Sequence, residues 1–283
     1  MILFKNSLQI QDFLKKKRLS SLRTGFVPTM GALHKGHLSL LERSKNENNL
    51  TICSIFVNPT QFNDPDDYKK YPVTIEQDIY LLENSGCDLL FMPSVMEIYP
   101  DGIENLNHYN LGYLELILEG KYRPGHFQGV CQVVHKLLEI VMPDHLYLGQ
   151  KDFQQCMVIK KLIELIGLSE NINTVICPTF RESNGLAMSS RNQRLTEEER
   201  EKAATISATL KFIKDNLKPG TTELIKMNAE QMLTEKGFEI DYLEIADAET
   251  LQGCKFWDGK SKIMALAAAI INKVRLIDNM IIN

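Results

Sequence analysis

Over residues 1–176 the chain alternates short apolar runs with amphipathic helical patterns. The strand-like runs cover residues 25–27, 50–57, 88–92, 145–148 and 173–177, and helical patterns at 37–46, 74–84, about 127–141 and 152–166 lie between them. Strands that alternate with helices usually pair in parallel, because each connection crosses over the sheet. The order therefore predicts an α/β fold with a Rossmann-like parallel sheet.

Beyond residue 177 the order changes. Residues 181–196 are polar and basic, and helical patterns follow at 197–214 and about 222–235. Strand-like runs then come at 238–245, 262–269 and 273–277. Helices followed by strands are typical of an α+β unit. We therefore expect two domains, residues 1–176 and a smaller α+β domain of residues 177–283.

Composition narrows the class of protein. The 283 residues are 44% hydrophobic and 24% charged, and the formal net charge is −4, which gives no electrostatic reason to bind nucleic acid or an anionic membrane. No run reaches the roughly 18 apolar residues of a membrane span, and the first residues lack the order of a signal peptide. The six cysteines form no C-x-x-C pair and several sit in apolar runs, so we expect reduced core thiols and a cytoplasmic protein.

The segment Pro28-Thr-Met-Gly-Ala-Leu-His34-Lys-Gly36-His37 follows the first predicted strand and leads into a helix. In parallel sheets this is where ligands bind, and a helix N-terminus offers unpaired N–H groups to an anion. His34 and His37 flank Gly36, so both imidazoles can donate hydrogen bonds to one phosphate. The segment matches H-x-G-H, the signature of a nucleotidyltransferase superfamily that acts on the α-phosphate of nucleotides.

Three further segments carry polar groups at predicted strand ends or in a loop. Asn58 and Gln61 end the second strand, where their amides suit hydroxyl groups or a carboxylate. Gly149-Gln-Lys151-Asp152 precedes a helix that contains Gln155, and a lysine at a helix N-terminus indicates an anionic ligand. The loop Met188-Ser189-Ser190-Arg191 combines hydroxyls with a guanidinium that can grip phosphate; we interpret it as a mobile anion-binding loop.

These four segments, together with Tyr122-Arg-Pro-Gly-His126-Phe127, resemble the pantoate–β-alanine ligase family. The resemblance runs from the first strand to about residue 196, and the C-terminal third matches only loosely. It implies ATP-dependent condensation of (R)-pantoate with β-alanine through a pantoyl-adenylate, with AMP and pyrophosphate released. It also implies Mg²⁺, a homodimer, and a second domain that carries the triphosphate loop and closes over the site.

The resemblance also implies roles for individual residues. The catalytic residues are expected to be His37, the family's proton donor, with His34, Lys151, Ser189 and Arg191. Pantoate and β-alanine are expected to contact Gln61, Gln155 and Asn58. The family's magnesium cluster falls on residues 76–78, where we choose Asp78 because Gln77 interrupts the acidic run. The expected ATP-binding residues are Met30, Gly31, Ala32, Leu33, His34, Lys35, Gly36, His37, Gly149, Gln150, Lys151, Asp152, Phe180, Met188, Ser189, Ser190 and Arg191.

Two alternatives remain at this point. One is a transferase of the same superfamily that leaves a nucleotide on its product, such as a phosphopantetheine or nicotinate mononucleotide adenylyltransferase. The other is a non-catalytic nucleotide sensor, which the joint presence of His34, His37, Lys151 and Arg191 disfavours. A tRNA-binding synthetase is disfavoured by the acidic balance.

Overall fold

The computed structural model describes residues 1–63, 65–104 and 106–283. Asp64 and Asn105 lie outside the described residues, the latter within segment 99–113, whose role the sequence leaves open. Contacts divide the chain into two compact units. The first unit comprises Met1–Gly149 and Gln154–Pro178, and the second comprises Gln150–Phe153 and Thr179–Asn283.

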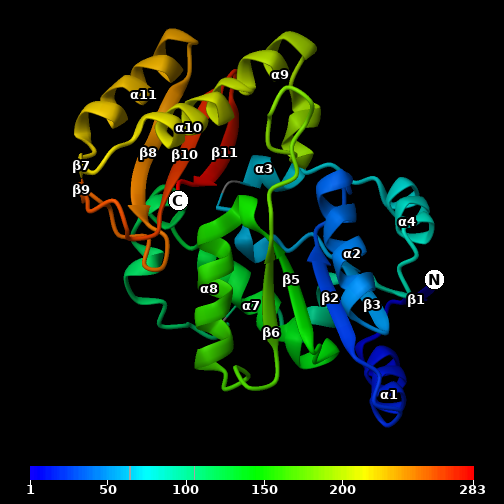
Figure 1. Ribbon diagram of the computed structural model, residues 1–283. Coiled ribbons are helices and arrows are strands. Elements are labelled where there is room, and N and C mark those ends of the chain that lie inside the picture. Colours follow the sequence, from blue (N-terminus) through cyan, green and yellow to red (C-terminus); the bar gives the residue numbers. More distant parts are fainter. Residues whose placement is uncertain (64, 105) are drawn as a thin grey trace. The chain divides into compact units, whose positions relative to one another are not determined.

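A six-stranded sheet forms the centre of the first unit (Figure 1). Its strands are β1 (Ile2–Phe4), β2 (Thr24–Thr29), β3 (Leu50–Ile55), β4 (Leu89–Phe91), β5 (His145–Gly149) and β6 (Asn173–Cys177). They lie in the order β1-β4-β3-β2-β5-β6, and every neighbouring pair is parallel. The predicted parallel sheet is thus confirmed, and β1 is an addition that was too short to give a sequence pattern.

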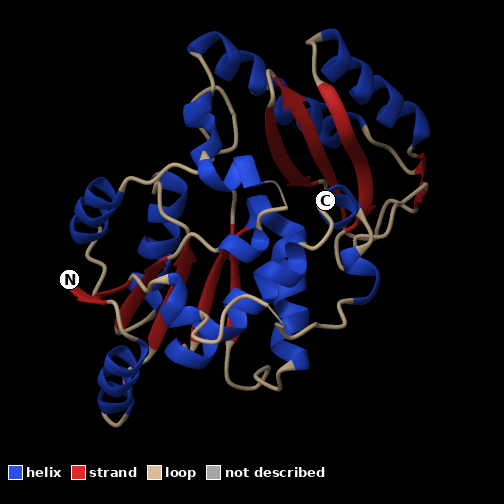
Figure 2. Ribbon diagram, turned by 180° about the vertical axis from the view of Figure 1, so that it is seen from behind, coloured by secondary structure: helices blue, strands red, loops and turns tan. Residues whose placement is uncertain are grey.

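Helices connect these strands and lie on both sides of the sheet (Figures 1 and 2). The helix α2 links β2 to β3, α7 precedes β5, and α8 links β5 to β6. The predicted strand at 50–57 ends earlier, at Ile55, because Asn58 caps a short 3-10 helix. The helices of this unit are α1 (Ser7–Arg18), α2 (Lys35–Glu47), η1 (Pro59–Gln61), α3 (Pro65–Lys69), α4 (Ile75–Asn84), α5 (Val95–Ile98), η2 (Gly112–Glu115), α6 (Leu118–Tyr122), α7 (His126–Val141) and α8 (Phe153–Leu165).

The second unit holds a three-stranded antiparallel sheet in the order β11-β10-β8, made by β8 (Glu239–Asp247), β10 (Ile263–Ile271) and β11 (Val274–Ile281). A small pair, β7 (Gly220–Thr221) with β9 (Phe256–Trp257), was not predicted. The helical elements are η3 (Gln150–Asp152), η4 (Ser190–Arg194), α9 (Glu197–Ala203), α10 (Thr205–Asn216) and α11 (Glu223–Glu235). The single helix predicted for 197–214 is therefore interrupted at Ala204.

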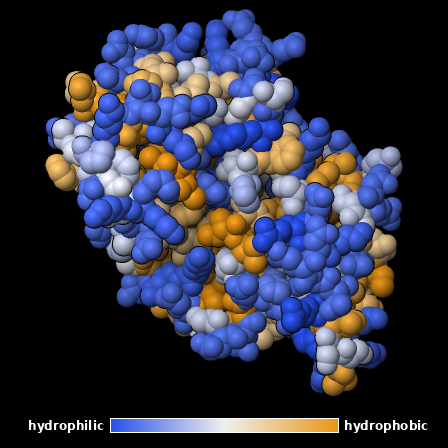
Figure 3. Space-filling model, viewed as in Figure 1, coloured by the Kyte–Doolittle hydropathy of each residue, from blue (hydrophilic) through white to orange (hydrophobic). Residues whose placement is uncertain are grey.

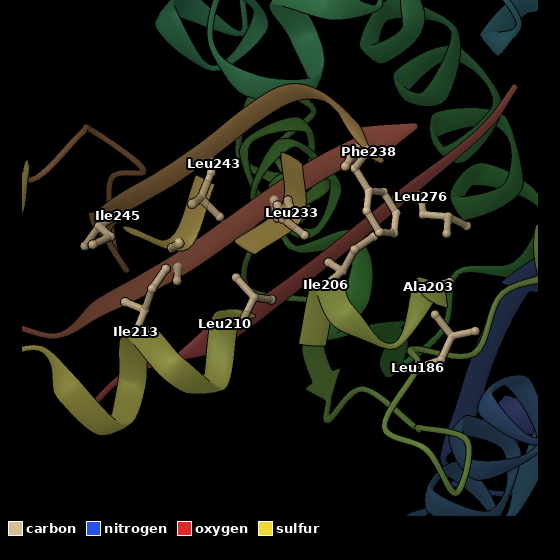
Figure 4. Packing of buried hydrophobic residues seen from close by; sticks show 14 of the residues in the cluster. Leu186, Ala203, Ile206, Leu210, Ile213, Leu233, Phe238, Leu243, Ile245 and Leu276 are labelled. Carbon is tan, nitrogen blue, oxygen red and sulfur yellow. The ribbon is translucent and has the colours of Figure 1, made fainter. Parts of the chain in front are cut away.

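The core of the second unit lies between its helices and its sheet (Figure 4). Ile206, Leu210 and Ile213 follow helical spacing along α10, so one face of that helix turns toward the strands. Leu243 and Ile245 of β8 face the same layer. This arrangement of helices on one face of an antiparallel sheet is the α+β architecture that the sequence predicts.

All six cysteines are free thiols. Burial raises the pKa of Cys87 and of Cys131 to about 12, so neither thiol is a nucleophile near neutral pH. None of the described helices is both long and apolar enough to cross a bilayer. Hydrophilic residues cover most of the face shown in Figure 3, with smaller apolar patches between them.

Candidate active site

The H-x-G-H segment lies where the order of strands reverses. From β2 the chain proceeds to β3 and β4 on one side of the sheet, and it later enters β5 on the other side of β2. In open parallel sheets the crevice at this reversal, outside the carboxyl ends of the strands, is the usual ligand site. Residues 30–37 run from the carboxyl end of β2 into the start of α2.

A tight turn before the histidines is held by a buried carboxylate. Gly31 and Ala32 both adopt left-handed backbone conformations, with φ of 86° and 50°. The N–H of Ala32 donates to Asp78 Oδ2 at 2.9 Å, and the N–H of Leu33 donates to Oδ1 at 2.7 Å. The hydroxyl of Thr74 also donates to Oδ1, at 3.1 Å, and Asp78 is only 1% exposed.

These contacts change two expectations for α4. The predicted capping box between Thr74 and Gln77 is wrong: Thr74 occupies the N-cap position, but its side chain caps no backbone N–H because its hydroxyl turns to Asp78. The second expectation made Asp78 a magnesium ligand. Its oxygens already accept three hydrogen bonds in a buried position, which does not fit a carboxylate that must meet a hydrated cation. Within the described residues, no group of three or more His, Cys, Asp or Glu side chains is arranged to hold a metal ion.

His34 and His37 form a stacked pair. Their ring centroids are 4.0 Å apart with an interplanar angle of 30°. Nδ1 of His34 accepts from the N–H of Gly36 at 3.1 Å, and Nδ1 of His37 accepts from the N–H of His34 at 3.3 Å. A ring nitrogen that accepts from a backbone N–H carries no proton, so the proton of each neutral ring is on Nε2. Each imidazole thus has its donor at the atom that does not cap the helix.

Asn58 and Gln61 belong to one buried network at the end of β3. Asn58 is fully buried, and its Nδ2 donates to Gln61 Oε1 at 3.2 Å and to the carbonyl of Gly129 at 3.0 Å. Its Oδ1 accepts from the hydroxyl of Tyr99 at 2.9 Å. Gln61 Nε2 lies 3.0 Å from the sulfur of Met30. The side chain of Asn58 therefore bonds within the protein, with one of its hydrogen bonds to Gln61, and its predicted contact with substrate has no support in this network.

Helix α7 fixes the backbone of Gln61. Nδ1 of His126 lies 2.8 Å from the carbonyl oxygen of Gln61, and Nε2 lies 3.1 Å from Nη1 of Arg123. A carbonyl only accepts and a guanidinium only donates, so His126 is neutral with its proton on Nδ1. Beside it, a Cβ added to Gly129 would lie 2.2 Å from the carbonyl oxygen of Thr60. The missing side chain allows α7 to approach η1 closely.

A cavity of about 240 Å³ adjoins the turn at Gly31. Its walls come from the carboxyl-end loops of three neighbouring strands and from the start of α4. Most of the lining side chains are apolar. The full lining comprises Met30, Gly31, Ala32, Ile55, Phe56, Val57, Pro72, Val73, Thr74, Ile75, Asp78, Met92, Pro93, Ser94 and Val95. The cavity belongs to the ligand-binding edge of the sheet, where small-molecule pockets usually form.

Gln154 and Gln155 differ in role although they are adjacent on α8. Gln154 is buried; its Oε1 accepts from the N–H of Glu119, and its Nε2 donates to the carbonyls of Leu114 and Ile117 at 2.8 and 2.9 Å. It therefore holds the segment between η2 and α6. Gln155 is only partly buried, and its predicted contact with substrate stays a prediction.

In the second unit, the segment with Lys151 is fastened to β11. Asn279 Nδ2 donates to the carbonyls of Gln150 and Lys151 at 2.8 and 2.9 Å. The Lys151 ammonium lies 3.4 Å from the carboxylate of Asp152, a loose pair, and the Lys151 side chain is 16% exposed. The backbone of Lys151 is thus anchored, and its ammonium makes a loose contact with the neighbouring Asp152.

The predicted anion-binding loop has a defined local fold. Arg181 and Ala187 form an antiparallel bridge, and Arg181 makes a two-pronged ion pair with Asp278 of β11 at 2.6 and 3.0 Å. Burial raises the pKa of Asp278, and the Arg181 guanidinium acts in the opposite direction. Ser189 then caps η4, which contains Arg191, by accepting from the N–H of that residue.

The predicted site residues fall into two groups, one in each unit. In the first unit, the structure brings together the turn at residues 30–33, the two histidines, Gln61 and Asp78. The second unit contains Gln150, Lys151, Asp152, Phe180 and residues 188–191. That the two groups act on one phosphate chain stays a prediction.

Several supporting residues were not found from the sequence. Asp78 in its anchoring role, His126, Gly129, Asp278 and Asn279 all act on segments far from them in the chain. Two of them gave a local signal. His126 belongs to the Tyr122–Phe127 segment that carries the resemblance, although no role was assigned to it, and Gly129 is an isolated glycine inside a helical pattern.

Comparisons with known proteins give a consistent result. A family model described as pantoate-beta-alanine ligase matches residues 2–281. The pantothenate synthetase of Cytophaga hutchinsonii is 43% identical over 285 residues, covering 100% of this chain and 99% of that protein. That of Flavobacterium psychrophilum is 44% identical over 283 residues, covering 99% of each.

Two solved structures resemble this one along their whole length. The crystal structure of pantothenate synthetase from Thermus thermophilus has a TM-score of 0.91 and 37% identity, covering 100% of this chain and 99% of that one. Pantoate-beta-alanine ligase from Francisella tularensis, crystallised with beta-gamma ATP and beta-alanine, has a TM-score of 0.82 and 40% identity, covering 99% and 97%.

Proposed function

The chain belongs to the pantoate–β-alanine ligase family, and we propose that it condenses (R)-pantoate with β-alanine in an ATP-dependent reaction that yields pantothenate. The observation that carries this proposal is the stacked pair His34 and His37 at the strand-order reversal of the sheet. Both rings hold their proton on Nε2, as required of donors to a phosphate oxygen.

In the first step, a carboxylate oxygen of pantoate attacks the α-phosphorus of ATP, and the bond to pyrophosphate breaks. The product is a pantoyl-adenylate. Negative charge grows on the α-phosphate oxygens and on the leaving pyrophosphate, so catalysis requires alignment and positive or N–H groups rather than a protein nucleophile. We assign the α-phosphate to His34 and His37, with His37 as proton donor.

In the second step, the amine of β-alanine attacks the acyl carbonyl of the adenylate. The amide bond forms, the amine loses a proton, and AMP leaves. We assign pantoate to Gln61, which is fixed through both its side chain and its carbonyl oxygen, and to Gln155. A rigid glutamine amide suits a small hydroxy acid because it both donates and accepts.

We expect the cationic side chains that bind the triphosphate to belong to the second unit. We assign this role to Lys151 and Arg191, with the hydroxyl of Ser189, because their backbones are held by β11 or by the start of η4. Lysine binds phosphate as a point charge, whereas arginine presents a planar fork. The remaining ATP contacts named from the sequence, including Phe180, stand as part of the same proposal.

Three further features are proposals on the same footing. We propose that Mg²⁺ binds to the nucleotide phosphates, since Mg²⁺ sites at nucleotides usually combine substrate phosphates with water, and we assign no reaction step to it. A homodimer and a cytoplasmic location follow from the resemblance and from the composition. Sedimentation of the purified protein tests whether it is a homodimer.

One assay tests the reaction. The purified protein is given ATP, magnesium and pantoate, and AMP is measured with and without β-alanine. We expect AMP release in repeated turnovers only when β-alanine is present, together with pantothenate detected by mass spectrometry. A nucleotide-transferring enzyme needs no amine, so amine-independent turnover would contradict the proposal, and so would the absence of any pyrophosphate release.

A further inference from the structure

We propose that Asp78 is a positioning residue for the two histidines and not a ligand of Mg²⁺. Its carboxylate holds the turn at residues 31–33 and so determines where His34 and His37 lie. The inference rests on the proposed function, because the assignment of the α-phosphate to these imidazoles gives their position its importance.

The turn needs a partner of this kind. Gly31 and Ala32 are consecutive left-handed residues, and such a turn directs successive N–H groups toward one point, where an anion binds. Ala32 has a side chain and is strained in this conformation, which persists only where the surroundings hold it. Here the anion is the carboxylate of Asp78, which accepts from the N–H groups of Ala32 and Leu33.

The effect reaches the histidines through the chain itself. Leu33 is bonded to His34, which is the N-cap of α2, and His34 in turn donates its N–H to His37. A displaced Leu33 would therefore move both rings. Misplacement of reacting groups by about 1 Å can lower a rate by on the order of 10²-fold.

The same contacts argue against metal binding. Oδ1 accepts from the N–H of Leu33 and the hydroxyl of Thr74, and Oδ2 accepts from the N–H of Ala32. Mg²⁺ demands an octahedral shell at about 2.0–2.1 Å and usually keeps several waters. The Asp78 side chain is buried beside a mainly apolar cavity, so such a shell would require the turn to open.

The decisive variant is Asp78→Asn, which keeps the shape but places an amide N–H₂ against one of the two backbone N–H groups. We expect kcat for β-alanine-dependent AMP release to fall on the order of 10²-fold. The Mg²⁺ concentration for half-maximal rate should change by less than about twofold, since no metal ligand is lost. Glu83→Gln is the control: it removes an exposed carboxylate from the same helix and should leave both quantities unchanged.

A fall in kcat of less than about fivefold would overturn the proposal, because that reduction is far smaller than the expected one. A loss that extra Mg²⁺ restores would overturn it too and would make Asp78 a metal ligand. If Asp78→Asn does not fold, the variant Thr74→Val tests the proposal instead. That variant keeps the carboxylate and both backbone bonds, and it should lower kcat by about three- to tenfold with unchanged Mg²⁺ dependence. An unchanged kcat or a shifted Mg²⁺ dependence in Thr74→Val would be equally fatal.

A measurement without turnover separates this inference from the proposed function. Hydrogen bonds to a carboxylate are short and strong, so the amide protons of Ala32 and Leu33 should resonate downfield in wild type. In Asp78→Asn they should move upfield, because an amide replaces the carboxylate, and in Glu83→Gln they should stay in place. If wild type makes no pantothenate but these shifts occur, the proposed function fails while the anchoring role stands. Unmoved resonances overturn the anchoring role whatever the activity.

Discussion

The two units hold their proposed phosphate-binding groups by different means. In the first unit, the turn before the histidines is fixed by hydrogen bonds from its backbone N–H groups to a buried carboxylate on another helix. In the second unit, backbone pairing shapes the loop, and one ion pair with β11 fastens it. In both, the fastening residue lies far along the chain: 46 positions separate Ala32 from Asp78, and 97 separate Arg181 from Asp278. Motifs that carry chemistry are local, whereas the groups that hold them are not.

The largest expected effect is on the stability of the second unit. Asp278→Asn leaves the guanidinium of Arg181 without its buried counter-charge, and breaking a buried pair in this way costs about 3–5 kcal/mol. Trp257, the single tryptophan of the chain, is in this unit and is largely buried, so its fluorescence during urea unfolding reports on that unit. We expect a lower urea midpoint.

The control for that variant is Asp215→Asn, which removes an exposed ion pair with Lys211 in the same unit. Exposed pairs between residues four apart on a helix contribute about 0.3–0.5 kcal/mol. Equal shifts for the two variants would show that the Arg181–Asp278 pair has no special part in fastening the loop.

Removing one phosphate donor from each unit tests whether both take part in one reaction. His37→Ala and Lys151→Ala should each lower kcat on the order of 10²–10³-fold, which corresponds to about 2.7–4 kcal/mol. The kcat is measured as pyrophosphate release with ATP, pantoate and β-alanine, and circular dichroism checks the fold. A change below about fivefold in either variant would remove that residue from the mechanism.

The sequence predicted the fold well because its signals are periodic and local. The five predicted strands of the parallel sheet match β2 to β6, and the α+β character of the second unit is confirmed. What failed was short or set by distant contacts. The strand β1 has three residues, and its pairing with β4 joins segments that no local pattern connects.

The site was harder to predict for the same physical reason. A motif such as H-x-G-H fixes residue types, but hydrogen-bond partners depend on which segments fold against one another. Asp78 was chosen as a metal ligand because the resemblance places the family's magnesium cluster on residues 76–78, yet its carboxylate is buried and accepts from two backbone N–H groups. Asn58 was likewise assigned to substrate, but its side chain is fully buried and hydrogen-bonded within the protein.

A smaller effect is expected where α7 presses on η1 in the first unit. In Gly129→Ala the added Cβ would meet the carbonyl oxygen of Thr60 at 2.2 Å and Cα of Gln61 at 2.6 Å, so backbone must move. Overpacking of this kind costs about 1–3 kcal/mol. The KM for pantoate should rise, because Gln61 is displaced. Gly253→Ala adds the same group where nothing is closer than 3.6 Å, and it should leave the urea midpoint and the KM unchanged.

The smallest expected effect is on the KM for pantoate, and it distinguishes the roles of the two ring nitrogens of His126. Its Nδ1–H donates to the carbonyl oxygen of Gln61, and the amide nitrogen of asparagine can occupy the place of Nδ1, whereas that of glutamine lies nearer the place of Nε2. Loss of one such hydrogen bond corresponds to about 0.5–1.5 kcal/mol, up to roughly tenfold in KM. His126→Gln should therefore raise the KM for pantoate while kcat changes little. In His126→Asn the KM should be close to that of wild type. Equal KM values in the two variants would mean that His126 only fills space, and that no hydrogen bond from α7 holds the backbone of Gln61 as Asp78 holds the histidine turn.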